Sequence, residues 1–464
     1  MIKKILLIYP PSTLMFSIEP KRGAVPLGLA YLASSLIQEG YEVEILDTYV
    51  EGYETESELD RGRTRVGLSR QEISKRISNY KPDLVGISCM FTDHWEDSYE
   101  VSSIVKEVEE NILVVMGGVH PTVVPEIVMQ NQNIDYVLRS EAEVSLPDLL
   151  KCLNLKGVLS KVDGLVYREG HKILTNTKKT FIEDLDAIPF PSRDLLDMEK
   201  YFQIGRAYRV PSKHEPAISM VTSRCCPAHC YFCSTHQMMG HYRLRSVQNV
   251  LEEVDHLVYT YGMREIYFLD DNLIYDKTRT LKLLDGLINR RYNLDWHDPN
   301  GIAIYSLDEE LIDKMQESGC YKLLLAIESG DQEVLSTIMH KPVDLKEVKR
   351  LVKYAKSTGM VVESLFMVGS PGETKDQINR TINLARSLDL DYVTFPIATP
   401  FPGTNFYQEC KQKGYLVKDL RYENLKFGIG NIITPEFTPE YLQEIRHKAW
   451  QDINFREKGL EVPN

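Results

Sequence analysis

The sequence lacks any apolar run long enough to cross a membrane. It opens with MIKKILLIYPPS, in which basic side chains precede an apolar run of only five residues that Pro10 and Pro11 interrupt. Such a run is too short for the core of a signal peptide, and no later stretch reaches the length of a transmembrane helix. We therefore expect a cytoplasmic protein without a membrane span.

Positive charge is also in short supply, because the formal net charge is -13. Such a chain repels a phosphate backbone, so we expect no nucleic-acid partner and no binding to an anionic membrane. A small molecule or a peptide is easier to accommodate. The composition is otherwise that of a folded chain, with 43% hydrophobic and 26% charged residues. Its length suggests about three domains.

Cysteine is scarce outside one short stretch. Half of the eight cysteines fall between Cys225 and Cys233, which does not suit a disulfide framework and fits a reducing compartment. The segment VTSRCCPAHCYFC places Cys226, Cys230 and Cys233 in a CxxxCxxC spacing. Three thiolates on one loop can each bind a different iron of a 4Fe-4S cube. The fourth iron is then left open for chemistry.

Other interpretations of this loop remain open. A structural zinc ion could take His229 or His236 as its fourth ligand, although zinc sites usually need a second ligand pair and none lies at a suitable distance. The thiols could also be unrelated buried side chains. Cys225 allows a second register, in which it replaces Cys226 as the first ligand.

The loop resembles the signature of radical SAM enzymes, whose open iron binds the amino and carboxylate groups of S-adenosylmethionine (SAM). The resemblance implies that the aromatic ring of Phe232 approaches the adenine. Pro227 is also typical of the family and favours Cys226 as the first ligand. Cys225 departs from the pattern, because relatives often have glycine there.

The first 150 residues alternate apolar strands with helices. Continuous apolar strands of this kind predict a parallel sheet covered on both faces, which binds its ligand beyond the strand C-termini. We expect strands at 5–9, 43–47, 84–88, 112–116 and 136–139, and helices at 29–39, 72–78, 101–108 and from 144.

Two of these strand ends resemble elements of cobalamin-binding domains. Ser88 begins an SxM match to the SxL element, whose serine contacts the nucleotide tail, and Gly117 and Gly118 match the GG element that makes room for it. The DxHxxG element has no match after the first strand, so the resemblance implies a cobalt without a protein histidine. His94 and His120 lie near strand ends but outside any such motif. The alternative is a flavodoxin-like domain that has lost its ligand.

The rest of the chain predicts three further segments. Residues 151–212 read as a linker with a hairpin that turns at Glu169 and Gly170. Residues 213–405 contain six strand-helix units without a dinucleotide glycine fingerprint, which suits the partial barrel of radical SAM enzymes. Residues 406–464 read as a short helical cap. The expected fold is α/β, with a Rossmann-like cobalamin-binding domain, a partial (βα)6 barrel and this cap.

Barrel chemistry sits at strand C-termini, and polar residues follow three further predicted strands. Alternatively, each of these polar residues is a solvated carboxylate or a helix N-cap. The resemblance implies that the methionine amino group lies near Asp270 and Asp271, the ribose at Glu328 supported by Ser329, and the adenine and methionine end near Gly369, Glu373 and Phe395.

The resemblance implies a 4Fe-4S cluster, SAM and cobalamin as cofactors, and an electron donor such as flavodoxin or ferredoxin. A 5′-deoxyadenosyl radical would abstract hydrogen from an unactivated carbon, and methylcobalamin would methylate a small-molecule or peptide substrate. One alternative is a cyclisation or ring rearrangement like that of the anaerobic porphyrin-ring cyclases. Another is a non-enzymatic iron-sulfur protein that senses SAM or redox state.

Overall fold

The computed structural model describes residues 1–15, 20–205 and 212–462 of the chain. The chain divides into two compact units, Met1–Ser212 with Gln237–Gly240, and Lys213–His236 with His241–Asn464. Within the described ranges, every helix is too short or too polar to traverse a bilayer.

The first unit is built on a seven-stranded sheet with the order β10-β9-β8-β7-β6-β1-β3. Strands β3, β1, β6, β7 and β8 run parallel to one another. Strand β9 pairs antiparallel with β8, and β10 pairs antiparallel with β9. The strands are β1 (Lys4–Tyr9), β3 (Glu42–Asp47), β6 (Leu84–Ser88), β7 (Leu113–Gly117), β8 (Tyr136–Leu138), β9 (Leu165–Glu169) and β10 (Lys172–Thr175).

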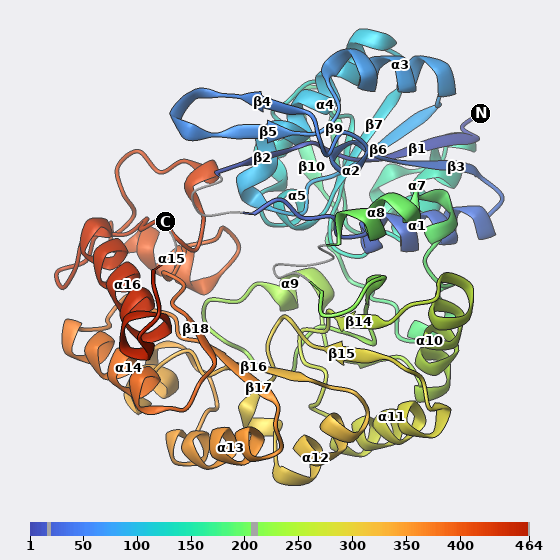
Figure 1. Cartoon of the computed structure of the whole chain (residues 1–464). Coiled ribbons are helices and arrows are strands. Elements are labelled where there is room, and N and C mark those ends of the chain that lie inside the picture. Colours follow the sequence, from blue (N-terminus) through green and yellow to red (C-terminus); the bar gives the residue numbers. More distant parts are fainter. Residues whose placement is uncertain (16–19, 206–211, 463–464) are drawn as a thin grey trace. The chain divides into compact units, whose positions relative to one another are not determined.

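Helices cover both faces of this sheet, as the apolar strands predict (Figure 1). On one face, α3 and α4 bury side chains such as Ile77 and Val101. On the other, α1 and α7 bury Leu36 and Leu149. The doubly wound architecture is therefore confirmed. The helices are α1 (Leu27–Gln38), α2 (Thr48–Glu51), α3 (Arg70–Tyr80), α4 (Trp95–Val108), α5 (Val119–Val123), α6 (Pro125–Val128), α7 (Ser145–Asn154) and α8 (Met198–Ile204).

The hairpin expected in the linker is part of this sheet. Strand β9 pairs with β8, with Tyr167 opposite Tyr136, and Leu165 and Val166 are buried. Its alternating pattern predicted a hairpin, but the pattern does not say which edge the hairpin extends. A small antiparallel sheet of β2 (Ser12–Leu14), β5 (Thr64–Val66) and β4 (Glu56–Glu58) is also present, and its three-residue strands leave no readable alternation.

The linker helix α8 is anchored to the same unit by a buried hydrogen bond. The Tyr201 hydroxyl donates to Asp47 Oδ2 at 2.6 Å, at the end of β3. Burial raises the pKa of Asp47 to about 6. The segment between the hairpin and residue 205 is therefore tied to the sheet and does not form a free tether.

The second unit contains six parallel strands in two groups, β11-β14-β15 and β16-β17-β18. Single bridges from Trp296 to Cys320 and from Ile302 to Leu325 connect the groups. Among the described residues, β11 and β18 each pair with one neighbour, so the barrel is open. The strands are β11 (Ala217–Met220), β14 (Glu265–Phe268), β15 (Asp295–His297), β16 (Lys322–Ala326), β17 (Val361–Leu365) and β18 (Tyr392–Thr394).

The helices of this unit begin at side chains that cap them. Ser246, Asp276, Asp308 and Thr374 each accept a hydrogen bond from a backbone N–H of the first turn, which satisfies a donor that the helix cannot pair. The elements are α10 (Val247–Tyr261), α11 (Lys277–Arg290), α12 (Glu309–Glu317), α13 (Leu345–Ser357), α14 (Lys375–Ser387), α15 (Asn405–Gln412) and α16 (Pro439–Asn454), with the short strands β12 (Ser223–Arg224) and β13 (Arg243–Leu244). Helix α9 (Thr235–Met239) is divided between the units, because Gln237–Gly240 belong to the first.

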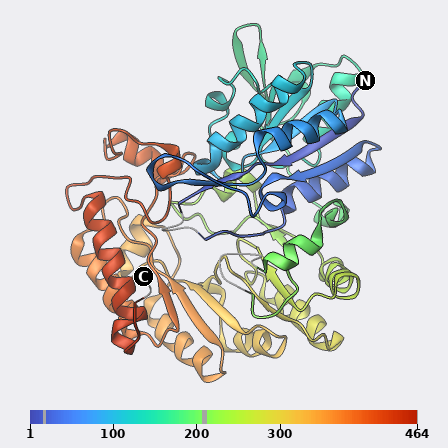
Figure 2. The ribbon, with the colours of Figure 1, turned by 45° about the horizontal axis from the view of Figure 1, so that its top comes forward.

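The last helix, α16, covers the end of the barrel near β18 and α14 (Figure 2). Thr438 caps it and Pro439 is its first residue. Leu442 is fully buried, and Trp450 donates from Nε1 to the Tyr392 hydroxyl at 2.8 Å. The cap therefore packs on the barrel through its apolar face.

Candidate functional site

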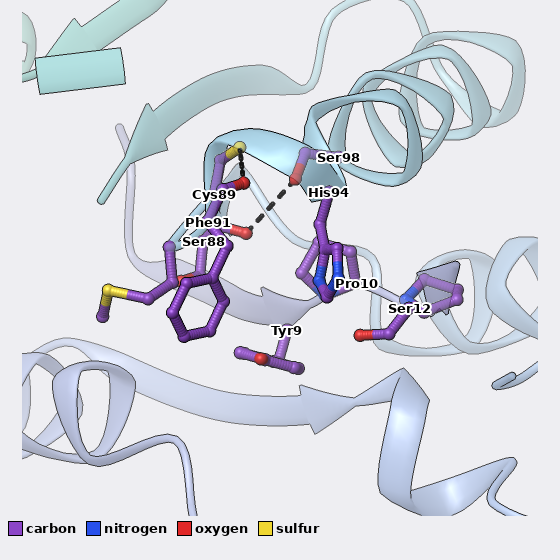
Figure 3. A pocket seen from close by; sticks show the side chains of 10 residues that line it. Tyr9, Pro10, Ser12, Ser88, Cys89, Phe91, His94 and Ser98 are labelled. Atoms are coloured by element: carbon purple, nitrogen blue, oxygen red, sulfur yellow. Dashed lines mark hydrogen bonds between the residues drawn. The ribbon is translucent and has the colours of Figure 1, made fainter. Parts of the chain in front are cut away.

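The sheet of the first unit changes winding direction between β1 and β6. From β1 the chain passes to β3 on one side, and then returns to β6 on the other. In open α/β sheets, such a switch point leaves a crevice beyond the strand C-termini, where ligands bind. A small pocket lies there, between the segment after β1 and the segment after β6 (Figure 3). Its lining is Tyr9, Pro10, Pro11, Ser12, Ser88, Cys89, Met90, Phe91, His94 and Ser98.

The structure brings the SxM and GG segments together, as the sequence predicts. Ser88 is opposite Gly117 in the β6–β7 pair, and Cys89 N donates to Gly117 O at 2.8 Å. At Gly118, φ is +114° and a Cβ atom would lie 2.5 Å from Cys89 O, so the protein backbone itself requires glycine. At Gly117, the nearest atom to an added Cβ is Leu138 O at 3.7 Å. Only Gly117 therefore leaves space that a ligand could fill.

Two histidines border this crevice. His94 lies in the pocket, with Nε2 3.6 Å from Asp93 Oδ2, and its ring meets Phe91 edge to face. His120 is buried, and burial lowers its pKa to about 4, so its imidazole is neutral. Neither follows β1, where a cobalt-binding histidine is expected. The most exposed side chains of the pocket are apolar, with Phe91 53% and Met90 39% accessible, which fits a planar organic ligand.

In the second unit, the cysteine loop leaves the C-terminal end of β11. It is held by Asp270, which is fully buried. The Asp270 carboxylate accepts from Thr222 N at 3.1 Å, from Thr222 Oγ1 at 2.9 Å and from the Ser223 hydroxyl. The methionine amino group was expected near Asp270 and Asp271, and that place stays a prediction. The hydrogen bonds of the Asp270 carboxylate are directed to the cysteine loop, so this side chain positions the loop.

The four cysteines of the loop have different environments. Cys225 is buried, and its sulfur lies 3.6 Å from His236 Nδ1. Its φ of +69° falls in the region that favours glycine, which gives a physical reason for a glycine at this position in other proteins. Cys226 and Cys230 are half-buried, Cys233 is exposed, and none is in a disulfide. The burial pattern favours the register that starts at Cys226.

The histidines proposed as zinc ligands are engaged with other groups. His236 Nε2 lies 2.9 Å from Ala228 O, and its ring stacks on His229 at 4.0 Å. In the parts of the chain that the structure describes, no three His, Cys, Asp or Glu side chains gather around a point as one metal ion requires. Three thiols spread along a loop suit the corners of a larger cluster.

Glu328 is paired with a lysine that the sequence did not single out. Lys341 Nζ lies 3.0 Å from Glu328 Oε1, and the side chains are 9% and 12% exposed. Burial acts to lower the pKa of Lys341, but Glu328 and Cys230 outweigh this effect and the pKa is raised. Glu328 has a φ of +68°. A buried ion pair thus stands beside the cluster cysteines.

Three other predicted residues shape the loops around this pair. Ser329 is buried and bonds to Thr381, so it supports the Glu328 loop. Gly369 has a φ of +89° and an added Cβ would lie 2.6 Å from Leu442. Glu373 Oε2 accepts from Gly369 N at 2.8 Å and from Ser370 N at 2.9 Å. Burial raises the pKa of Glu373 to about 7. Glu373 thus fixes the backbone of the loop at Gly369 and Ser370.

The remaining predicted residues differ in solvent exposure. Phe232 is partly exposed on the cysteine loop, and Asp271 is exposed and accepts from the Thr235 hydroxyl. Phe395 is only 1% exposed and stacks on Phe366 with ring centres 6.0 Å apart. Phe395 was expected near the adenine, but its ring is part of the hydrophobic core.

A cavity of about 450 Å³ lies beside the cysteine loop, within the range of small-molecule sites. Tyr231 faces it from the cysteine loop, and its ring contacts His340 edge to face. The π-helix Val334–Ile338 provides one wall, a helix type that often occurs at functional sites. The lining residues are Tyr231, Glu333, Thr337, Ile338, His340, Pro371, Gly372, Gln377 and Glu409.

Comparison with known proteins matches a different family to each unit. Residues 19–150 match the B12 binding domain family, and residues 220–385 match the radical SAM superfamily. Cytidylyl-2-hydroxyethylphosphonate methyltransferase of Streptomyces wedmorensis is 32% identical over 99% of this chain and 92% of the relative. The chain belongs to the cobalamin-binding-domain-containing radical SAM enzyme family.

Other members of this family extend the comparison. An uncharacterized methyltransferase of Pyrococcus horikoshii is 32% identical over 99% of this chain and 94% of its own length. An anaerobic magnesium-protoporphyrin IX monomethyl ester cyclase of Rubrivivax gelatinosus is 26% identical over 89% of this chain and 70% of the relative. The methyltransferase TsrM from Kitasatospora setae has the same fold, with a TM-score of 0.71 and 18% identity over 89% of this chain and 75% of that one.

For a radical SAM enzyme of this kind, sequence reasoning missed residues that reach the cysteines from distant strands. Lys341 is the first, because it is 13 residues from Glu328 and no motif marks it. Asn272 and Tyr305 are the others, since both approach Cys226. Asn272 directly follows Asp271, so its position after a predicted strand could have marked it as a candidate site residue. No motif or strand end in the sequence marks Tyr305.

Proposed function

We propose that this enzyme is a cobalamin-dependent radical SAM methyltransferase that acts on a small-molecule or peptide substrate. The observation that carries the proposal is the cysteine loop at the C-terminal end of the first barrel strand, with three thiols in the CxxxCxxC spacing and a buried Glu328–Lys341 pair beside them. Two methyltransferases that align with nearly the whole chain support it.

We infer a division of labour among the residues of the second unit. Cys226, Cys230 and Cys233 would hold three irons of a 4Fe-4S cluster. Glu328 would accept hydrogen bonds from the ribose hydroxyls of SAM, since a carboxylate has several acceptor positions. Lys341 pairs with that carboxylate and presents a cation near the thiolates.

In the first unit, Ser88 and Gly117 stand where a nucleotide tail of cobalamin would enter. The open position at Gly117 and the exposed apolar rim of Met90 and Phe91 fit such a group. When bound, the cluster supplies the electron that cleaves SAM into a hydrogen-abstracting radical, and cobalamin carries the methyl group. The electron donor, such as a flavodoxin or ferredoxin, is part of the proposal.

Isotope transfer tests this function. The reconstituted holoenzyme would be incubated with methyl-deuterated SAM, a low-potential reductant and cytidylyl-2-hydroxyethylphosphonate, the compound in the name of one relative, alongside other candidate substrates. We expect a product that carries the label, with one S-adenosylhomocysteine and one 5′-deoxyadenosine for each methyl group transferred.

A second candidate function is radical cyclisation or rearrangement, which the aligned cyclase relatives favour. Substrate turnover with formation of 5′-deoxyadenosine, but without label in the product, would support cyclisation and refute methylation. If no 5′-deoxyadenosine forms with the reduced cluster under any condition, the enzymatic proposal fails and a sensor of SAM or redox state takes its place.

A further inference from the structure

Asn272 and Tyr305 meet at the sulfur of Cys226. Asn272 follows β14, and Tyr305 lies in the 3-10 turn Ile304–Ser306 after β15. Asn272 Nδ2 is 2.9 Å from the Tyr305 hydroxyl and 3.7 Å from Cys226 Sγ. Because Asn272 Nδ2 contacts both groups, the Tyr305 hydroxyl lies next to the Cys226 sulfur. Three neighbouring strand ends thus converge on one thiol.

The chemistry of these groups fixes the direction of each hydrogen bond. A cysteine that ligates iron is a thiolate and can only accept, so Tyr305 donates its single proton to sulfur. The tyrosine oxygen must then accept from the Asn272 amide, which is the orientation that the structure shows. Asn272 is only 1% exposed, and Tyr242 donates to its backbone carbonyl at 3.0 Å, so the backbone that carries the amide is held in place.

The three cluster cysteines have different polar neighbours. The cation of Lys341 faces Cys230, and a backbone N–H of Thr235 faces Cys233. Cys226 faces two neutral donors, the Tyr305 phenol and the Asn272 amide, whose Nδ2 is 3.7 Å from the sulfur. Hydrogen bonds to cluster sulfurs are one of the means by which a protein sets a reduction potential.

We propose that Tyr305, oriented by Asn272, is a positioning residue that stabilises the reduced cluster through a hydrogen bond to the Cys226 sulfur. One electron from a low-potential donor converts the 2+ cluster to the 1+ state, and the added negative charge strengthens an O–H···S bond. The bond therefore favours the reduced form. The inference rests on the proposed function only in requiring a cluster on Cys226.

The test compares four reconstituted full-length proteins, which are wild type, Tyr305→Phe, Asn272→Leu and the double variant. The fraction of reduced cluster is followed by electron paramagnetic resonance in a redox titration without SAM. For Tyr305→Phe we expect the ratio of reduced to oxidised cluster at a given potential to fall about tenfold, which is about 59 mV for a one-electron couple.

Asn272→Leu should lower the same ratio, because the tyrosine is no longer oriented and the amide contact to the Cys226 sulfur is lost. The change in the double variant should be smaller than the sum of the two single changes, since residues in one hydrogen-bond network are not additive. Tyr354→Phe is the matched control, because its hydroxyl bonds to Asp313 at 2.9 Å on the outer helices of the barrel. It should leave the potential unchanged.

The outcomes separate this inference from the proposed function. If wild type and Tyr305→Phe carry the same cluster with the same reduction potential, the inference is wrong, while the proposed cluster on Cys226, Cys230 and Cys233 is supported. If wild type holds no cluster, the proposed function fails first. Should Tyr305→Phe not fold, as judged by circular dichroism, Asn272→Leu alone decides, and an unchanged potential in that variant overturns the proposal.

Discussion

Lys341 Nζ lies 3.0 Å from Glu328 Oε1, although 13 residues separate them in the chain and both side chains are almost excluded from solvent. A buried carboxylate needs such a partner, because an uncompensated charge in this environment is strongly destabilising. The pair therefore places a carboxylate beside the cysteine loop with little exposure to water.

We expect Glu328→Gln to weaken SAM binding. The amide offers fewer acceptor positions to the ribose, and it leaves Lys341 without its counter-charge. Loss of a hydrogen bond to a charged group corresponds to about 1.5 to 3 kcal/mol, or a tenfold to hundredfold higher Kd. Isothermal titration of SAM into the reconstituted protein measures this Kd. Glu363→Gln is the control, because Glu363 pairs with Lys322 at 3.6 Å on β16 and β17. Equal affinities in both variants would remove Glu328 from the SAM site.

The cysteine register is tested by single substitutions. Cys226→Ala, Cys230→Ala and Cys233→Ala should each abolish the charge-transfer absorption of the cluster, since each removes the only protein ligand of one iron. Cys225→Gly should keep it, because Cys225 is buried and its φ of +69° suits glycine. Absorption and bound iron are measured after anaerobic reconstitution. Retention in Cys226→Ala together with loss in Cys225→Gly would show that the other register is correct.

Gly117→Val should abolish cobalamin binding without unfolding the first unit. The position has no positive φ, and the nearest atom to an added Cβ is 3.7 Å away, so the backbone admits a Cβ and the γ carbons of valine should fill the ligand space. Gly28→Val is the control, since Gly28 is exposed and an added Cβ meets nothing within 4 Å. Cobalamin retained after gel filtration is the readout. Full retention in Gly117→Val would place the cofactor elsewhere.

The same preparation tests the cobalt environment. No histidine follows β1, so the reduced cob(II)alamin form should show no nitrogen superhyperfine splitting in electron paramagnetic resonance. Variants that lack the cluster cysteines should still bind cobalamin, because each unit has its own core. Splitting that disappears in His94→Ala would instead identify His94 as a lower ligand.

The pKa of Glu373 makes stability depend on pH. Burial raises it from 4.5 to about 7, with a smaller contribution from the charge of Asp331, so the folded state binds a proton that the unfolded state releases. The stabilising contribution is present in full below pH 4.5 and is lost as pH rises through about 7. Between these limits the free energy of unfolding should fall by about 3 kcal/mol.

Glu373→Gln should remove this dependence, because an amide accepts the same two backbone hydrogen bonds without titrating. The difference between the urea midpoints of the variant and the wild type should therefore grow from pH 5 to pH 7.5. Asp376→Asn, on the first turn of α14, serves as a control for charge alone. Parallel pH profiles for wild type and Glu373→Gln would contradict the assignment.

Several features could be predicted from the sequence because the forces behind them are local. The cysteine spacing lies within eight residues of chain, and a capping side chain such as Ser246 or Asp308 bonds to a backbone group three residues away. The alternation of apolar strands with helices likewise predicted a doubly wound sheet and an open barrel, since both depend on patterns inside each element.

The tertiary structure alone decided which loops meet. Strand order placed Thr222 against Asp270, so that the Asp270 carboxylate anchors the cysteine loop, and it directed the ring of Phe395 into the core. It also brought Tyr305 to Cys226 and joined the predicted linker hairpin to the first sheet. These partners lie tens of residues apart, and their meeting depends on the order and register of strands, a property of the whole fold that no short segment encodes.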